Sequence, residues 1–212
     1  MKLRNAASIV ASLAAVAWTT EALAHHAMGG ALPSTLMQGL ISGFAHPVIG
    51  IDHLAFVIAM GVAAAFTPRR LLTPLAFVVA TVIGCLLLIA GIGLPIAEVV
   101  VTGSAVLVGA MVLSGRSYSA AAYMVIFAIA GVFHGWAYGE SIVGAEPTPL
   151  IAYLVGFAAT QYVFAIGVGW IVRSVWQAGT PEAIKPRLAG AVAAGVGLAF
   201  LIENLEGMLF GA

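Results

Sequence analysis

The residues of this chain that could do chemistry gather in one short stretch of an otherwise apolar segment. His46, Asp52 and His53 lie within eight residues of one another, with Pro47 and Gly50 between them. Imidazole and carboxylate ligands together suit Ni, Co, Zn, Fe or Cu(II), and they suit Ca or Mg poorly. A carboxylate in apolar surroundings is costly unless a partner, an ion or a water-filled path compensates for its lost hydration. The stretch therefore predicts a binding site for a divalent transition-metal ion.

A regular helix would not bring these side chains to one ion. His46 and His53 are seven positions apart, so on a helix they share a face but are separated by about 10 Å. Pro47 cannot donate a hydrogen bond to the carbonyl of Gly43, and Gly43 and Gly50 loosen the helix further. We therefore expect a kinked or interrupted helix that gathers the two imidazoles and the carboxylate and exposes backbone carbonyls.

Three more ionisable residues, at or near the outer ends of later apolar segments, are candidates for the same site or its approach. They are His134, Glu140 and Glu203. We expect His134 to contribute to the metal site from a second helix, and Glu140 and Glu203 to line the path of the ion. The plainer interpretations are a helix-end histidine that is hydrogen-bonded to a neighbouring span, and two acids at the membrane surface.

The composition is that of an integral membrane protein. Of the 212 residues, 62% are hydrophobic and 8% are charged, and the mean hydropathy is +1.12. An average soluble domain has about 25% charged residues. The formal net charge is zero, so nothing indicates a nucleic-acid partner, and the partner of this surface is the lipid bilayer. The single cysteine, Cys85, lies in an apolar run and predicts a small buried residue rather than a disulfide or a redox pair.

Residues 1–24 are typical of a secretory signal peptide. They begin with Lys2 and Arg4, continue through a short apolar run and end in Ala22-Leu23-Ala24. An uncleaved first helix is the alternative. Cleavage before His25 would place a free amine beside His25 and His26, and an amine with an imidazole can chelate copper or nickel. A solvated terminus without a ligand is the plainer interpretation of that pair.

The remaining residues, 25–212, predict an all-α transmembrane domain of six helices. Glycine, proline and short polar stretches divide this part of the chain into apolar segments, each long enough for about 20 helical residues. The predicted spans are residues 35–66, 71–91, 94–114, 118–139, 149–175 and 187–210.

The basic residues predict the orientation of these spans. If the mature chain starts outside the cytoplasm, every second connection faces the cytoplasm, and these connections contain all the mature chain's lysines and arginines. This partition follows the positive-inside rule and places both mature termini in the periplasm. The residues are Arg69, Arg70, Arg116, Arg173, Lys185 and Arg187.

Two of the spans carry similar polar insertions. His46 and Asp52 are six residues apart, as are His134 and Glu140, and a glycine closely precedes each acid. Three spans in each half would give the halves opposite orientations. The pattern is compatible with a 3+3 inverted repeat, in which the substrate site lies at the repeat interface. Chance is the alternative for so short a likeness.

The stretch from His46 to Gly61 resembles the HPxxGxDHxxxxxxxG signature of the HupE/UreJ proteins, bacterial inner-membrane permeases associated with nickel or cobalt uptake. The likeness extends to the signal peptide, the number of spans and the block from His134 to Glu140, and so covers most of the chain. It implies that loss of His46, Asp52 or His53 abolishes transport. Many family members have histidines where this chain has Tyr138 and, in the fifth span, Gln161, which leaves the full ligand set and the choice between nickel and cobalt open.

The sequence thus predicts a secondary transporter or facilitator rather than an enzyme, with no permanent cofactor. It contains no GxxxxGK[ST] motif for ATP and no HExxH motif for zinc hydrolysis. A haem-binding electron-transfer protein is the alternative, because histidines on different helices can be axial ligands, although haem requires no carboxylate beside His53. A purely structural subunit would leave the ionisable groups unexplained. The sequence is also compatible with a homo-oligomer.

Overall fold

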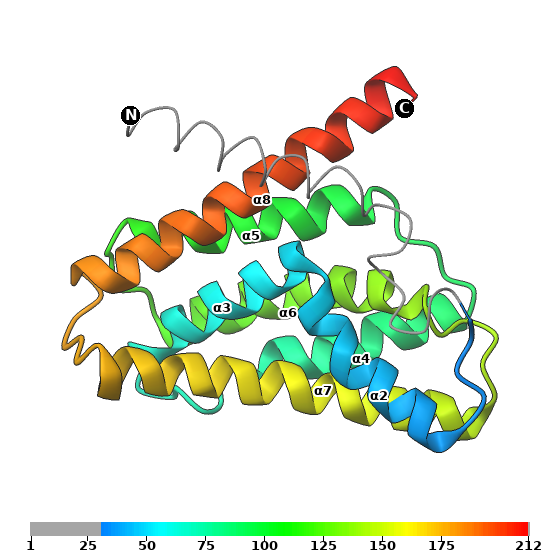
Figure 1. Ribbon diagram of the computed structural model, residues 1–212. Helices are drawn as coiled ribbons and strands as arrows, with labels where there is room; N and C mark the ends of the chain where they lie inside the picture. The colour runs from blue at the N-terminus through cyan, green and yellow to red at the C-terminus, as the bar shows by residue number, and fades with distance from the viewer. Residues whose placement is uncertain (1–30, 212) are drawn as a thin grey trace, which may run out of the picture.

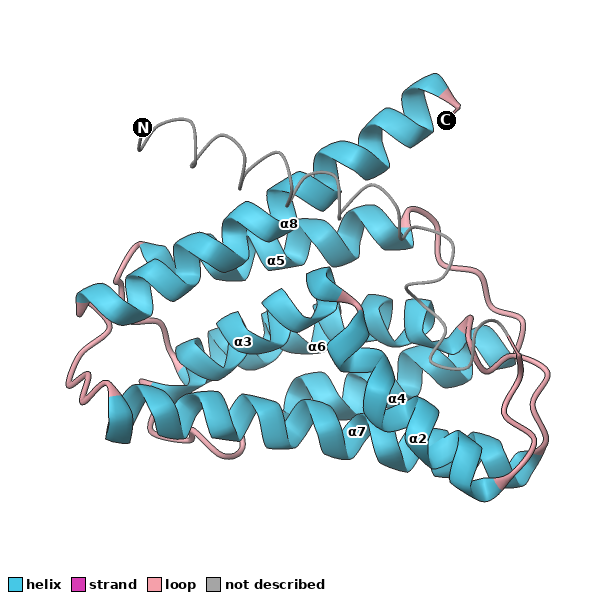
Figure 2. Cartoon of the chain, in the orientation of Figure 1, coloured by secondary structure: helices cyan, strands magenta, loops and turns pink. Residues whose placement is uncertain are grey.

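The computed structural model describes residues 31–211, and every regular element in that range is a helix (Figure 2). The all-α prediction is therefore confirmed for the described residues. The predicted signal peptide, His25 and His26 lie outside them. The elements are α2 (Leu36–Ile49), α3 (Ile51–Ala65), α4 (Leu75–Ile89), α5 (Ala97–Leu113), α6 (Ala120–Gly139), α7 (Pro147–Trp170), the π-helical turn η1 (Ile171–Val175) and α8 (Ile184–Phe210).

Local sequence signals account for several helix starts. The hydroxyl of Thr35 caps α2 by accepting a hydrogen bond from the amide of Gln38 at 3.2 Å, and Ser119 caps α6 in the same way. Such caps satisfy amides that have no partner inside the helix. Helix α7 begins with Pro147, whose missing N–H costs nothing in the first turn.

Helix α3 is the centre of the bundle. Twelve of its 15 residues are buried, and it packs against α5, α6, α7 and α8. Around it the helices form three closely packed pairs, α4 with α6, α5 with α8 and α2 with α7. Figure 1 shows α5 and α8 side by side on one side of the molecule and α2 with α7 on the opposite side, with α3 between them. Most side chains of α3 are therefore held in the interior of the bundle.

Glycines let the paired helices approach closely. A Cβ atom on Gly43 of α2 would collide with the carbonyl of Tyr153 on α7, and one on Gly135 of α6 with the carbonyl of Thr81 on α4. On α8, a Cβ at Gly190 would lie 2.7 Å from the carbonyl oxygen of Gly109 on α5. Small residues at contacts are expected in lipid, where apolar burial does not drive helix association.

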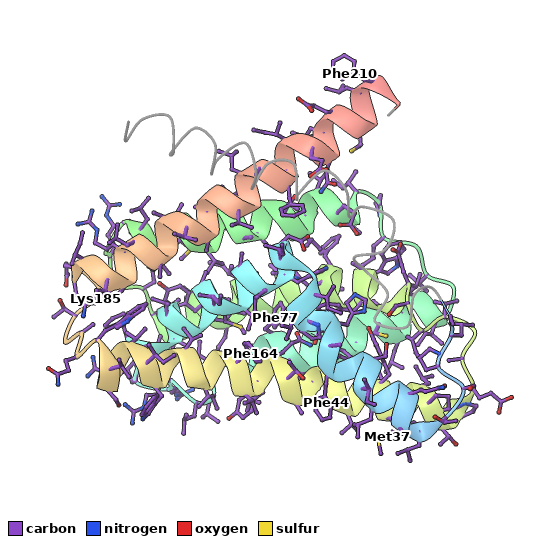
Figure 3. The ribbon with its side chains drawn as sticks, in the orientation of Figure 1. Met37, Phe44, Phe77, Phe164, Lys185 and Phe210 are labelled. Carbon is purple, nitrogen blue, oxygen red and sulfur yellow. The ribbon has the colours of Figure 1, made fainter. Side chains whose placement is uncertain are left out.

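The outer surface suits a lipid environment. Large apolar side chains such as Ile129, Val163 and Val192 are 58%, 65% and 67% exposed, whereas Phe77 in the interior is fully buried. In Figure 3 the side chains of Met37 and Phe210 project from the bundle while Phe77 lies within it. These outward residues are the ones that hydrocarbon chains would cover.

Three helices of the described residues are long and apolar enough to cross a membrane: α6, α7 continued by η1, and α8. Helices α2 and α3 pass the same test as one span bent by 78°. Helices α4 and α5 are apolar but shorter, with 15 and 17 residues. The structure thus supports a polytopic membrane protein with three or four spans by length, and the six spans and the internal repeat stay predictions.

Candidate metal-binding site

The site is built on the break between α2 and α3. Gly50 stands between the two helices in an extended conformation (φ −72°, ψ 102°), and the chain bends there by 78°. Pro47 lies inside the last turns of α2 and does not end the helix. The predicted interruption is therefore present, and it falls three residues after the proline. It turns His46 on α2 and the first turn of α3 towards the same interior region.

All three residues of the predicted centre are buried. His46 and Asp52 are each 4% exposed, and His53 is 2% exposed. Asp52 lies in the first turn of α3, where unpaired amides and the helix dipole favour a negative charge. The break therefore supplies part of the compensation that a buried carboxylate needs.

His134, fully buried on α6, contacts His53 directly. The two Nδ1 atoms are 2.7 Å apart, and the Nε2 atom of His134 lies 2.9 Å from the hydroxyl oxygen of Ser104 on α5. The rings of Phe56 and Phe77 also lie against the imidazole of His134. This geometry is consistent with the prediction that His134 contributes, from a second helix, to the site of His46, Asp52 and His53.

His46 is held by two hydroxyl groups from other helices. Its Nδ1 atom lies 3.0 Å from the oxygen of Ser141, in the turn after α6, and 3.0 Å from that of Tyr153 on α7. Tyr153 donates to the carbonyl of Tyr138 at 2.8 Å, and Ser141 contacts the same carbonyl at 3.0 Å. The imidazole is thus fixed against the end of α6.

Tyr138 lies between the two histidines of the broken span. Its ring stacks on His53 with centroids 4.3 Å apart and meets His46 edge-on at 5.0 Å. Both imidazoles, on opposite sides of the helix break, therefore pack on one buried aromatic ring. In the structure Tyr138 is the contact that joins His46 to His53.

Three buried side-chain polar atoms among residues 31–211 have no hydrogen-bond partner. They are Asp52 Oδ1, the Tyr138 hydroxyl and Gln161 Oε1, from α3, α6 and α7. The carboxylate of Asp52 also acts electrostatically on the Tyr138 hydroxyl. Because buried polar groups are almost always hydrogen-bonded, such atoms indicate a place for a water or an ion. Carboxylate and amide oxygens of this kind can ligate a cation.

Acidic residues lie at the end of the bundle nearest this centre. Glu98, in the first turn of α5, is close enough to Asp52 and Glu140 to be repelled by both carboxylates. Glu140 caps the end of α6 and is exposed. On α8, Glu203 is exposed too, and its neighbour Asn204 donates to the backbone carbonyl of Glu98 at 3.3 Å. Together these groups make this end attractive to cations.

The predicted ligands do not form a ready-made coordination sphere. Among residues 31–211, no group of three or more His, Cys, Asp or Glu side chains is arranged to hold a metal ion. His53 and His134 are brought together, and His46 is joined to them through Tyr138, whereas Glu140 and Glu203 lie at the exposed edge. The metal role of these six residues therefore stays a prediction.

Sequence reasoning missed two of the hydroxyl residues that hold the imidazoles, Ser104 and Tyr153. Each lies in an apolar span, where a hydroxyl commonly bonds to a carbonyl of its own helix. Ser104 makes that bond too, to Val101 at 2.7 Å, so its type and position alone gave no signal of a second contact.

Comparison with known proteins covers nearly the whole chain. The sequence model of one family, described as HupE / UreJ protein, matches residues 13–200. A protein named Protein HupE from Rhizobium leguminosarum bv. viciae is 29% identical over 199 residues, which are 92% of this chain and 97% of that protein. No solved structure matches this chain. The matched range includes the broken span and the residues described above as contacts of the buried histidines.

Proposed function

The chain belongs to the HupE/UreJ family, and we propose that it is a secondary transporter or facilitator that imports a divalent transition-metal ion, nickel or cobalt, across the bacterial inner membrane. Nickel and cobalt are proposed because the His46–Gly61 motif resembles that of permeases associated with nickel or cobalt uptake. The location of the site is proposed from the buried residues of this chain.

The observation that carries the proposal is a carboxylate oxygen left without a partner at a helix break. Asp52 Oδ1 is buried and accepts no hydrogen bond, and the imidazoles of His46 and His53 pack on the same tyrosine ring close by. A buried, unpaired carboxylate is costly, and a bound cation offsets that cost. Imidazole nitrogen with carboxylate oxygen is a ligand set suited to nickel and cobalt.

The distribution of charge supports inward movement. The carboxylates of Asp52 and Glu140 both act on Glu98, at the end of the bundle that the predicted topology places in the periplasm. A cytoplasm-negative potential favours influx by about 2.3 kcal/mol per charge per 100 mV, hence about twice that for a divalent ion. Influx therefore requires no ATP.

The opposite end carries the basic residues. Phe66, Arg116 and Pro181, from three different connections, line one small pocket, and Arg187 Nε donates to the carbonyl of Leu113 at 2.9 Å. The connections that hold all the mature chain's lysines and arginines therefore meet at one end. This supports the proposed topology of six spans, with this end in the cytoplasm and both mature termini in the periplasm.

Helix pairing supports the proposed inverted repeat. The first half would contain α2 with α3, then α4 and α5, and the second half α6, α7 and α8. In such a repeat α2 with α3 corresponds to α6, α4 corresponds to α7, and α5 corresponds to α8. The pair α4–α6 then corresponds to the pair α7–α2, and α5–α8 corresponds to itself. The three closest pairs thus obey the symmetry that a 3+3 repeat requires, and the candidate site lies where the halves meet.

The geometry does not favour the haem alternative. Two axial imidazole nitrogens, each about 2 Å from iron as in other first-row metal sites, would be about 4 Å apart. The facing nitrogens of His53 and His134 are 2.7 Å apart, which leaves no room for iron between them.

Uptake of radiolabelled nickel and cobalt tests the proposal. Cells that express the wild-type chain should accumulate one of these metals above cells with an empty vector, and His53→Ala should return accumulation to the background. Ser114→Ala is the matched control, because Ser114 lies at the opposite end of α5 and is exposed. Equal accumulation by the wild type and His53→Ala would overturn the mechanism.

A further inference from the structure

We infer that the hydroxyl groups of Ser104, Ser141 and Tyr153 fix the tautomers of the buried imidazoles, so that His46 and His53 both present Nε2 as the metal-binding nitrogen. His134 is then a positioning residue that acts through His53. The assignment of tautomers follows from the hydrogen bonds alone. Its use for binding a metal rests on the proposed function.

The Ser104 hydroxyl accepts, rather than donates, the hydrogen bond that it shares with His134. The Ser104 hydroxyl oxygen lies 2.7 Å from the carbonyl oxygen of Val101 and 2.9 Å from Nε2 of His134. A carbonyl can only accept, and a serine hydroxyl has one proton. That proton goes to Val101, so Ser104 accepts from His134. The Nε2 atom of His134 therefore carries hydrogen.

The tautomer of His134 determines the tautomer of His53. A neutral imidazole protonated on Nε2 is an acceptor at Nδ1. The Nδ1 atoms of the two rings are 2.7 Å apart, so His53 must donate from its own Nδ1. The unprotonated nitrogen of His53, the one that can ligate a metal, is then Nε2.

The short distance also suits a hydrogen bond between the facing nitrogens better than a shared tetrahedral ion. Two nitrogens that each lie about 2.0–2.1 Å from one tetrahedral ion are about 3.4 Å apart. At 2.7 Å, the Nδ1 atoms of His53 and His134 are closer than in that arrangement and suit a single hydrogen bond. His134 thus orients His53 in the way that outer-shell groups orient metal-binding histidines.

The hydroxyl groups of Ser141 and Tyr153 determine the tautomer of His46. The oxygens of Ser141 and Tyr153 each lie 3.0 Å from its Nδ1 atom. Both hydroxyls also contact the carbonyl of Tyr138, at 3.0 and 2.8 Å, where a hydroxyl can only donate. The Ser141 hydroxyl is also placed to donate to the Tyr153 oxygen at 3.1 Å. With the Tyr153 proton directed to the carbonyl of Tyr138, and the Ser141 proton to that carbonyl or to Tyr153, both oxygens are left to accept from an Nδ1–H group of His46. Its unprotonated nitrogen is again Nε2.

Two separate hydroxyl networks therefore lead to the same result on either side of the helix break. Each network ends on a backbone carbonyl, of Val101 on α5 or of Tyr138 on α6, which is held by its helix and cannot reverse the direction of the bonds. An N–H donated to an acceptor also makes the opposite ring nitrogen a better ligand.

Nitrogen-15 NMR of full-length protein with labelled histidine, in lipid bilayers without metal, tests the tautomers. The pH is kept well above the ordinary histidine pKa of about 6.5, so that the rings are neutral. Signals are assigned with single histidine-to-glutamine variants. We expect Nδ1–H on His46 and His53 and Nε2–H on His134. Nε2–H on His53 or on His46 in the wild type would overturn the inference.

Variants of Ser104 test its positioning role. Ser104→Ala should mix the tautomers of His134 and His53, and Ser104→Thr, which keeps the hydroxyl, should restore them. The control is Ser114→Ala, since the Ser114 hydroxyl makes the same kind of bond to the Met111 carbonyl at 2.7 Å. For His46 the matched pair is Tyr153→Phe and Tyr162→Phe, both on α7, since the Tyr162 hydroxyl donates to the Leu71 carbonyl.

Nickel and cobalt affinity, measured by calorimetry on the same purified proteins, separates this inference from the proposed function. We expect Ser104→Ala to weaken binding about 10- to 100-fold, the usual cost of losing an outer-shell partner, and Ser104→Thr to recover it. Unchanged affinity and unchanged tautomers in Ser104→Ala would overturn the inference while leaving the function intact. A wild type with the expected tautomers and no affinity for either metal would support the inference and overturn the function.

Discussion

Asp52 is a carboxylate buried inside the helix bundle. It is buried to 96%, and one of its oxygens has no hydrogen-bond partner. A group of this kind is retained only where its charge is used. The requirement for charge can be separated from the requirement for shape, because asparagine has nearly the same size and lacks the charge.

We predict that Asp52→Asn weakens metal binding at least about tenfold while the metal-free protein keeps or gains stability, because an amide is cheaper to bury than a carboxylate. Thermal unfolding in detergent without metal, together with binding calorimetry, gives both readouts. Glu182→Gln, at an exposed acid in the connection before α8, is the control for loss of one charge. Destabilised apo protein with unchanged affinity would mean that Asp52 is structural.

The histidines predict a pH dependence of metal binding. A protonated imidazole cannot ligate, so affinity should be complete where the rings are neutral and should fall as the pH drops from neutral into the range in which they are protonated. Two histidine ligands give a loss approaching a hundredfold per pH unit once both rings are protonated. The measurement is nickel or cobalt binding to purified protein across this range. Affinity that stays constant over the whole acidic range in which the protein remains folded would contradict imidazole ligation.

The sequence identified the residues at this scale because their types conflict with their apolar surroundings. His46, Asp52 and His53 are buried at one helix break, and His134 contacts His53. It could not identify Ser104 or Tyr153, because their role depends on a contact with a residue 30 or 107 positions away. A serine or tyrosine in an apolar helix does not conflict with its surroundings, so its residue type does not mark it as part of a site.

At the scale of the element, the broken span requires a residue without a side chain at Gly50. A Cβ atom there would lie 2.8 Å from Cδ2 of His53 and 3.5 Å from Oδ1 of Asp52. The first distance is shorter than side-chain contacts normally allow. The glycine therefore permits the break and also makes room for two of the predicted metal-binding residues.

We predict that Gly50→Ala lowers transport about tenfold or more, because His53 must move to accommodate the added methyl group. Gly103→Ala is the matched control, since a Cβ at Gly103 in α5 meets nothing within 4 Å. Uptake is measured against the amount of folded protein in the membrane. Equal transport by both variants would show that the orientation of His53 does not matter.

The sequence located the helices well and the break less well. Helices α2 to α8 lie within or close to the predicted apolar segments, because apolar length and helix-breaking residues are local properties. Three or four of them are spans by length, so the number of six stays a prediction. The break was expected from Pro47, yet α2 continues through that residue and ends before Gly50. Near the end of a helix, a missing N–H removes one bond but does not prevent the following residues from keeping helical angles.

The direction of transport depends on which end of the bundle faces the periplasm. Ile92, between α4 and α5, is 49% exposed near the acidic end, and Ser117, between α5 and α6, is exposed near the basic end. Helix α5 separates the two positions, so they should lie on opposite sides of the membrane.

We predict that a membrane-impermeant maleimide added to intact spheroplasts labels Ile92→Cys and does not label Ser117→Cys. Breaking the membrane should make the second variant reactive. The native Cys85 is buried and gives little background, and Cys85→Ala removes it. Labelling with the reverse pattern would invert the topology and place the acidic end in the cytoplasm.

The sequence alone did not predict which helices pack against one another. Glycines at helix contacts were expected, but nothing in a single sequence states that Gly43 meets Tyr153 or that Gly135 meets Thr81. These pairings depend on the complementary shape of surfaces far apart in the chain. They also place α3 at the centre of the bundle and so bury the predicted site.

The most direct test of the central claim is metal influx into vesicles that contain the purified full-length protein and a trapped fluorescent chelator. With an interior-negative potential, wild-type vesicles should fill with nickel or cobalt, and vesicles with Asp52→Asn should fill no faster than protein-free ones. Influx at the same rate through Asp52→Asn and the wild type would contradict the claim that the ion passes the buried carboxylate at the helix break.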